Sequence, residues 1–135
     1  MVLSAVMTLA AGLAGCSGQS SGPAAASAEP PPDLGAKLYS QNCLPCHRDD
    51  GKGVPTVYPS LAESPVVNGD PQELAQWVLG GKRPQSMPAG RYPTQMLLFG
   101  WMKDQDAAAL FTYIRSHFGN SAAPVDAATV AGARP

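Results

Sequence analysis

The sequence has few cysteines, few aromatic side chains and no surplus of positive charge. Only 3 of its 135 residues are cysteine, and an odd number excludes a disulfide framework in which every cysteine is paired. The 9 basic and 10 acidic residues give a formal net charge of −1 with histidine neutral. Because no basic surplus is available to neutralise phosphates, we expect no nucleic-acid partner. Aromatic residues make up 7% of the chain, so the core is small, and a small core usually needs a cofactor, a metal or a disulfide.

The sequence also lacks an apolar run long enough to span a membrane, which takes about 20 residues. Val2–Leu13 is shorter, carries no charge and is typical of the apolar part of a signal peptide. It leads into Leu13-Ala14-Gly15-Cys16, which resembles the lipobox of bacterial lipoproteins. That resemblance implies a lipoprotein signal peptide over residues 1–15, a lipid on Cys16 and a protein held on a membrane in the bacterial periplasm. An ordinary secretory signal with an unrelated cysteine is the alternative.

Glycine and proline are abundant, with 14 of each among 135 residues, against a usual combined share of roughly 12%. We therefore expect long loops and linkers. Residues 16–33 begin with Cys16 and continue with Ser, Ala, Gly and Pro, which bury too little apolar surface to fold, so this segment is predicted to be a flexible tether. A similar composition predicts a disordered tail over residues 121–135. The folded unit is therefore expected at residues 34–120.

Three segments of that unit have the pattern of helices. The first covers residues 34–44 and has Asp33 as its N-cap. Asp70-Pro71 opens the second with a capping residue and a first-turn proline, and Gly80-Gly81 ends it. Apolar residues recur at helical spacing over residues 104–118. No segment alternates as a strand, so the sequence predicts an all-α fold whose long loops surround something that is not protein.

The motif that explains those loops is Cys43-Leu44-Pro45-Cys46-His47. The spacing C-x-x-C-H is typical of c-type haem attachment. Two thiols three positions apart can each add to a haem vinyl group, and the next imidazole can then bind the iron. Three alternatives are weaker: a thioredoxin-like pair requires a βαβ context, a zinc site requires four ligands, and a disulfide across so short a loop is strained.

With this motif the chain resembles the class I c-type cytochromes over residues 34–120. Gly51-Lys52-Gly53 resembles the glycine turn that follows the family's motif. Tyr58-Pro59-Ser60-Leu61 resembles the family segment whose proline carbonyl accepts a hydrogen bond from the ligand imidazole. Residues 104–120 resemble the C-terminal helix of the family. The resemblance implies a cytochrome c fold, with three to four short helices and long loops wrapped around one covalently bound haem c.

The resemblance also implies roles for individual residues. Cys43 and Cys46 hold the haem covalently, and His47 binds its iron. The carbonyl group of Pro59 accepts a hydrogen bond from the His47 imidazole. The first and last helices cross closely at Gly35, where a small residue permits the approach.

The sixth iron ligand is less clearly marked. Met96 lies before Phe99-Gly100-Trp101 at the distance from the last helix that is usual in the family, and is the favoured ligand. Met87 is followed by proline, as axial methionines often are, and is the second candidate. Met102 is better explained as a core residue. His117, or no protein ligand at all, completes the alternatives.

These assignments predict a one-electron carrier with no substrate chemistry of its own. It would link a periplasmic or membrane dehydrogenase to a respiratory acceptor, with a dehydrogenase, an oxidase or another cytochrome as its redox partner. One alternative is a haem-based sensor or catalytic haem domain with an open sixth coordination site. The other is a docking lipoprotein in which the haem only completes the fold. The identity of the sixth ligand separates the carrier from the sensor.

Overall fold

The computed structural model describes residues 31–87 and 92–134. The predicted signal peptide, the lipidation site Cys16 and the tether as far as residue 30 lie outside the described residues and stay predictions. Within the described ranges no helix is both long enough and apolar enough to cross a membrane.

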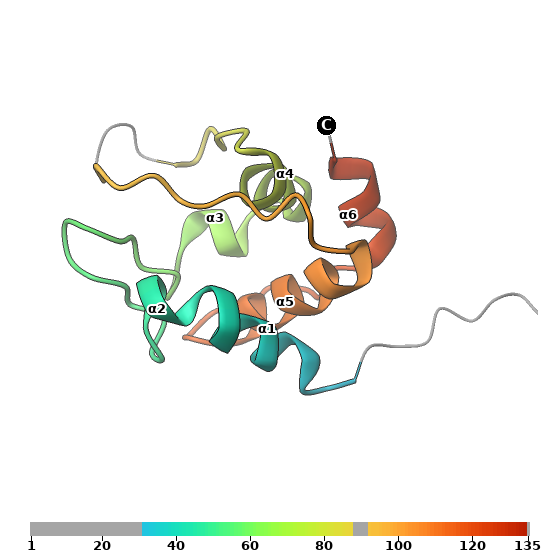
Figure 1. The fold of residues 1–135 in the computed structure, drawn as a ribbon, viewed down its shortest axis with the longest axis horizontal. Helices are drawn as coiled ribbons and strands as arrows, with labels where there is room; N and C mark the ends of the chain where they lie inside the picture. Colours follow the sequence, from blue (N-terminus) through green and yellow to red (C-terminus); the bar gives the residue numbers. More distant parts are fainter. Residues whose placement is uncertain (1–30, 88–91, 135) are drawn as a thin grey trace, which may run out of the picture.

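The described part of the chain is helical and has no strand, only an isolated bridge between Val54 and Tyr58. This confirms the predicted all-α fold class. Long irregular loops separate the helices (Figure 1). The helices are α1 (Leu34–Asn42), α2 (Leu44–His47), α3 (Pro65–Asn68), α4 (Pro71–Gly80), α5 (Asp104–Ser116) and α6 (Ala127–Ala133).

α1 and α5 cross in close contact because Gly35 has no side chain. A Cβ atom at this position would lie 2.4 Å from the carbonyl oxygen of Ala109 and 2.6 Å from Cβ of Tyr113. One turn further along α1, the ring of Tyr39 is buried and its centroid lies 5.6 Å from that of Tyr113. The predicted close crossing at Gly35 is confirmed, and it fixes the direction in which α1 leads to the next helix.

α4 begins and ends where its sequence predicts. The Asp70 side chain accepts a hydrogen bond from the backbone N–H of Gln72 at 2.8 Å, which satisfies one of the unpaired donors at the helix start. At the other end Gly81 has a φ of 75°, and its N–H donates to the Trp77 carbonyl. Asp33 differs: it occupies the N-cap position of α1, but its side chain makes no capping hydrogen bond.

α3 lies in a region expected to be irregular, and a buried arginine connects it to α5. Arg115 donates hydrogen bonds to the carbonyl groups of Val67 at 2.7 Å, Gly69 at 2.9 Å and Ala123 at 2.8 Å. Burial lowers the pKa of this guanidinium, although Asp70 opposes the effect. Three carbonyl oxygens thus take the place of water around a charge that would be costly to bury alone.

The prediction of a disordered tail over residues 121–135 is wrong for residues 121–134. This segment contains α6, which packs against α4 and α5 (Figure 1). Asp126 caps the helix by accepting a hydrogen bond from the N–H of Thr129 at 2.7 Å. Val125, Val130 and Ala133 are buried in the core. Burial of these few apolar side chains stabilises a segment whose composition alone suggested disorder.

Replacing Gly35 with alanine tests the helix crossing. The new methyl group meets backbone atoms that cannot rotate away, so we expect Gly35→Ala to lower the free energy of unfolding by about 1–3 kcal/mol. Denaturant unfolding of the haem-loaded protein measures this change. Gly132→Ala is the matched control, because nothing lies within 4 Å of a Cβ there and alanine is favoured over glycine in a helix by about 0.5–1 kcal/mol. Equal stability of the two variants would contradict the close crossing.

Candidate functional site

The attachment motif forms one helical turn directly after α1. The N–H of Cys43 donates to the Tyr39 carbonyl at 2.8 Å, and the N–H of His47 donates to the Cys43 carbonyl at 2.8 Å. The sequence predicted one helix over residues 34–44, whereas the structure has α1 and α2 meeting at Cys43. Residues three and four positions apart share a face of such a turn. The backbone therefore places Cys43, Cys46 and His47 together.

The two motif thiols are free and half-buried. Burial raises the pKa of the Cys43 thiol to about 11, and the neighbouring Cys46 adds to the rise. Cys43 is therefore a neutral thiol in the folded chain near pH 7. Both sulfur atoms are available for the thioether bonds that the motif predicts.

The imidazole of His47 is oriented by the backbone of a distant loop. His47 is buried, and its Nδ1 donates a hydrogen bond to the carbonyl oxygen of Pro59 at 2.9 Å. Burial lowers the pKa of His47, and the hydrogen bond to Pro59 partly offsets this effect. The ring is thus held neutral with its proton on Nδ1, which leaves the lone pair of Nε2 free to bind a metal.

The other ring nitrogen, Nε2, opens onto accessible space. It has no hydrogen-bond partner among residues 31–87 and 92–134, yet this part of the chain contains no side-chain nitrogen or oxygen that is both buried and unpaired. The Nε2 atom of His47 must therefore reach the accessible surface. A buried histidine with one nitrogen fixed and the other open is the arrangement that an axial iron ligand requires.

The loop that carries Pro59 folds back onto the motif through two glycines. Gly51 and Gly53 have φ values of 69° and 68°, which lie in the region that glycine adopts most easily. The N–H of Gly53 donates to the His47 carbonyl at 3.0 Å. A Cβ on Gly53 would lie 2.6 Å from the Pro59 carbonyl oxygen. The turn resembling the family's glycine turn is therefore the feature that brings Pro59 to His47.

Tyr39 connects the same loop to the helix crossing. Its O–H donates to the carbonyl of Arg48 at 2.5 Å, and Arg48 is the residue directly after His47. Burial raises the pKa of Tyr39, so the phenol stays protonated and keeps donating this bond. No pattern in the sequence indicates this contact.

The segment with the favoured sixth ligand comes from a different part of the fold. Met96 is half-buried against the core, and the backbone N–H of Phe99 donates to the carbonyl of Val78 in α4 at 3.0 Å. In Figure 1 this segment runs along the α4 side of the molecule, whereas α2 lies on the α1 side. Large apolar side chains are exposed along it, with Leu97 75% and Trp101 69% exposed.

Free thiols, an oriented imidazole and uncovered apolar side chains together fit a covalently attached haem. Apolar side chains that a small domain leaves exposed commonly mark a surface that a ligand or partner covers. His47 and the two cysteines would hold the group, and Met96 or Met87 would face it from the other side. Met87 is also half-buried and lies next to residues 88–91, which are outside the described residues.

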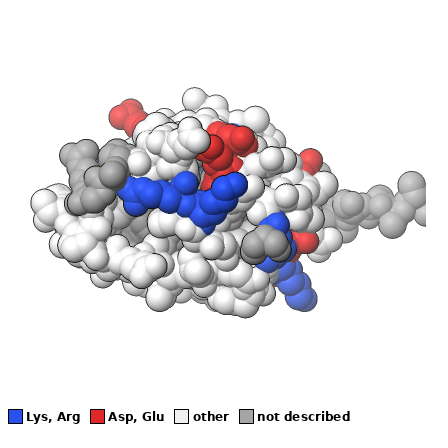
Figure 2. Space-filling view, turned by 90° about the horizontal axis from the view of Figure 1, so that it is seen from above, with Lys and Arg blue, Asp and Glu red and all other residues white. Residues whose placement is uncertain are grey.

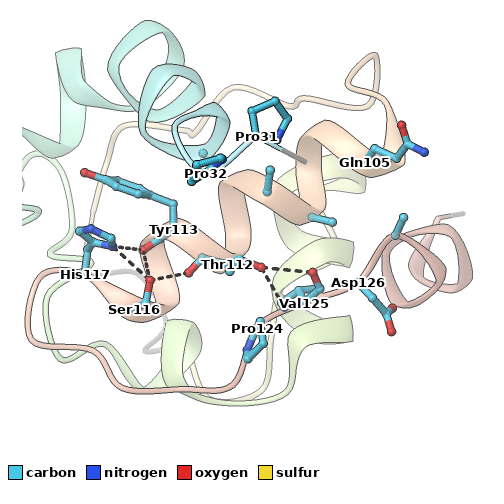
Figure 3. A pocket seen from close by; sticks show the side chains of 14 residues that line it. Pro31, Pro32, Gln105, Thr112, Tyr113, Ser116, His117, Pro124, Val125 and Asp126 are labelled. Carbon is cyan, nitrogen blue, oxygen red and sulfur yellow. Dashed lines mark hydrogen bonds between the residues drawn. The ribbon is translucent and has the colours of Figure 1, made fainter. Parts of the chain in front are cut away.

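His117, the minor candidate for the sixth ligand, has a structural explanation. Its ring stacks on Tyr113 with centroids 3.9 Å apart, and its Nδ1 lies 2.8 Å from the Tyr113 carbonyl oxygen. Figure 3 shows both residues lining a groove of about 500 Å³ between the start of α1, α5 and residues 124–127. None of Cys43, Cys46 and His47 lines this groove.

Charged side chains are sparse on the surface seen from above. Figure 2 shows a band of basic side chains with acidic ones beside it, a second basic group toward the right, and white surface between the charged groups. Lys82 and Arg83 follow α4 and lie with Glu73 around a small hollow of about 170 Å³.

An attachment motif on a helical turn, whose histidine is oriented by a backbone carbonyl inside an all-α fold, defines a c-type haem protein. The comparison with known families agrees, because the model of the family described as "Cytochrome c" matches residues 32–118. The chain belongs to the cytochrome c family. It binds haem c covalently.

Similar proteins include both large and small cytochromes. The chain is 38% identical to the cytochrome c subunit of the alcohol dehydrogenase (quinone) of Gluconobacter oxydans, over 67% of this chain and 19% of the relative. It is 35% identical to the gluconate 2-dehydrogenase cytochrome c subunit of Pantoea cypripedii, over 74% of this chain and 24% of the relative. For cytochrome c-552 of Thermus thermophilus the identity is 33%, over 75% of this chain and 76% of the relative. The chain thus spans a quarter or less of those two dehydrogenase subunits.

Removal of the attachment thiols tests the dependence of folding on haem. The described core is small and its loops are long, so we expect a chain carrying both Cys43→Ala and Cys46→Ala to lack a cooperative thermal unfolding transition. Circular dichroism during heating measures this. The haem-loaded parent protein is the reference. A cooperative transition in the haem-free double variant would contradict the prediction.

Proposed function

We propose that the protein is a one-electron carrier that links a dehydrogenase to a respiratory acceptor in the bacterial periplasm. The observation that carries the proposal is the fixed orientation of His47 by Pro59 next to two free motif thiols. Similarity to cytochrome c subunits of alcohol and gluconate dehydrogenases supports a dehydrogenase as the electron donor. The bound haem supplies reversible one-electron exchange between ferrous and ferric iron.

Met96 is the proposed sixth ligand. It is half-buried against the core, and the backbone of its segment is attached to α4 through Phe99. Methionine opposite histidine raises the reduction potential of the iron, and a site with two protein ligands has no open position for a substrate. The protein is therefore proposed to have no catalytic activity of its own. An open sixth position would instead make it a sensor or a catalytic haem domain.

The site residues perform distinct tasks in this proposal. Cys43 and Cys46 prevent loss of the haem, because thioether bonds are covalent. His47 is kept neutral and correctly oriented by the Pro59 carbonyl, which also increases the basicity of the ligating nitrogen. The exposed apolar side chains of the Met96 segment are suited to excluding water from the haem edge and to contacting a partner.

A lipid on Cys16 is the proposed membrane anchor. A single acyl chain binds a membrane only marginally, whereas two or more give stable attachment, and the bacterial lipoprotein cysteines that this site resembles carry at least two. The segment between Cys16 and α1 is predicted to be a tether, so the proposed anchor would keep the haem near membrane-bound redox partners.

The carrier function is tested by mixing the oxidised protein with a membrane-bound quinone-type dehydrogenase and its substrate. We expect rapid reduction, seen in the visible haem spectrum, and no binding of carbon monoxide to the ferrous protein. A mixture without the dehydrogenase substrate is the control. Slow reduction together with tight carbon monoxide binding would favour the sensor or catalytic alternative.

The same preparation identifies the sixth ligand. Ferric haem bound by methionine has a weak long-wavelength charge-transfer band, which we expect in the parent protein. Met96→Ala should abolish the band and open the ferrous site to carbon monoxide, whereas Met87→Ala should leave both properties unchanged. The reverse pattern would assign the role to Met87.

Substitution of Cys16 tests the anchor. We expect Cys16→Ser to move the protein from the membrane fraction to the soluble periplasmic fraction, since no acyl chains are attached, with the haem spectrum unchanged. Cell fractionation followed by haem staining measures the distribution. If the variant stays in the membrane fraction after a high-salt wash, an uncleaved apolar segment is the anchor and the lipid proposal is wrong.

A further inference from the structure

The side chain of Arg134 makes a three-way contact at the end of the described chain. Its Nε donates to Oδ1 of Asp104 at 2.6 Å, its Nη1 donates to the carbonyl of Gly100 at 2.8 Å, and its Nη2 donates to the carbonyl of Met102. A planar guanidinium can satisfy several acceptors at once because its donors are fixed in a fork. Two of the three acceptors are backbone atoms, so the contact fixes the backbone at Gly100 and Met102 as well as forming an ion pair with Asp104.

Burial of α6 determines where Arg134 lies. Val130 is fully buried and Ala133 is 3% exposed, so the last turn of the helix is fixed against the core. Arg134 follows directly as the C-cap residue of α6. Asp104 is the first residue of α5, so a carboxylate at the start of that helix also interacts favourably with its dipole. Both partners of the ion pair are thus positioned by helices.

The two carbonyl acceptors, Gly100 and Met102, lie at the C-terminal end of the segment that begins at Met96. Within this segment the N–H of Phe99 donates to Val78 in α4, and the N–H of Met102 donates to the Phe99 carbonyl at 2.9 Å. Phe99 and Met102 are buried, whereas Leu97 and Leu98 are exposed. The segment therefore has an attached end at residues 99–102 and a largely exposed part at residues 96–98.

We propose that Arg134 is a positioning residue that holds this segment closed and so keeps Met96 in place as the sixth iron ligand. The proposal rests on the assignment of Met96 made above, but Arg134 itself lies outside residues 32–118, which the family model matches. The charge-assisted hydrogen bonds to Gly100 and Met102 oppose movement of the backbone that follows Met96, and such bonds are stronger than neutral ones. Without them the end of the segment is held by the hydrogen bond from Phe99 to α4 and by burial of Phe99 and Met102.

Binding of imidazole to the ferric protein measures how often the segment opens. Imidazole can occupy the iron only when the methionine has left, so its apparent affinity is proportional to the open fraction. We expect Arg134→Ala to bind imidazole at least about tenfold more tightly than the parent protein, because hydrogen bonds to charged groups contribute more than neutral ones. Arg134→Lys keeps the charge but has no fork, so it should resemble Arg134→Ala more than the parent.

Two control variants separate positioning from general loss of stability and from loss of charge. Val67→Ala removes buried methyl groups from α3, which makes no contact with α6, and should lower the free energy of unfolding while leaving the imidazole affinity near that of the parent. Lys103→Ala removes a positive charge beside Asp104, and within the described ranges the Lys103 side chain makes no hydrogen bond or ion pair. It should also leave the affinity unchanged. An increase in Val67→Ala equal to that in Arg134→Ala would overturn the proposal.

Amide hydrogen exchange makes failure of this proposal distinguishable from failure of the Met96 assignment. We expect the N–H groups of Phe99 and Met102 to exchange faster in Arg134→Ala, whichever methionine binds the iron. If exchange and imidazole affinity both stay at parental values, the proposal is overturned even though Met96 remains the ligand. If Met96→Ala keeps the charge-transfer band, the control of Met96 by Arg134 is overturned together with the assignment of that ligand.

Discussion

The hydrogen bond from His47 to the Pro59 carbonyl is the interaction on which the functional part of this structure depends. It joins a helical turn to a loop twelve positions further along the chain, at 2.9 Å. Nothing in the helical turn itself orients the ring, so the loop must be folded before the histidine is usable as a ligand. Gly51 and Gly53, whose φ values are positive, shape the turn that brings Pro59 to His47. They therefore contribute to the orientation of the ligand as well as to the local turn.

The sequence predicted those parts of the fold that depend on local patterns. The helix starting after Asp70 has its capping residue and its glycine stop within a few positions, and both operate as expected. The C-x-x-C-H motif and the proline segment are likewise short and contiguous. Asp33 shows the limit of such reasoning, because it occupies the N-cap position without making a capping bond. Backbone geometry, rather than residue type, decides whether a cap forms.

The contacts that sequence reasoning missed join residues far apart in the chain. Composition suggested that the last residues are disordered, yet Val125 and Val130 are buried there. The signal that could have indicated a helix was Asp126 before an alanine-rich run, since aspartate is a good N-cap and alanine the best helix former. No local pattern indicates that Arg115 reaches three carbonyl groups, or that Arg134 reaches the segment after Met96. Such partners exist only once the helices have packed.

The position of α1 has a mechanical consequence. The helix has 9 residues, so it separates the point where the chain enters the domain from Cys43 by about 13 Å at a rise of 1.5 Å per residue. Tension applied at the N-terminal end of α1 acts first on the crossing at Gly35, where α1 lies so close to α5 that a Cβ atom would be 2.4 Å from the Ala109 carbonyl oxygen. A pull on the chain before α1 is therefore resisted at this crossing before it reaches Cys43 and His47.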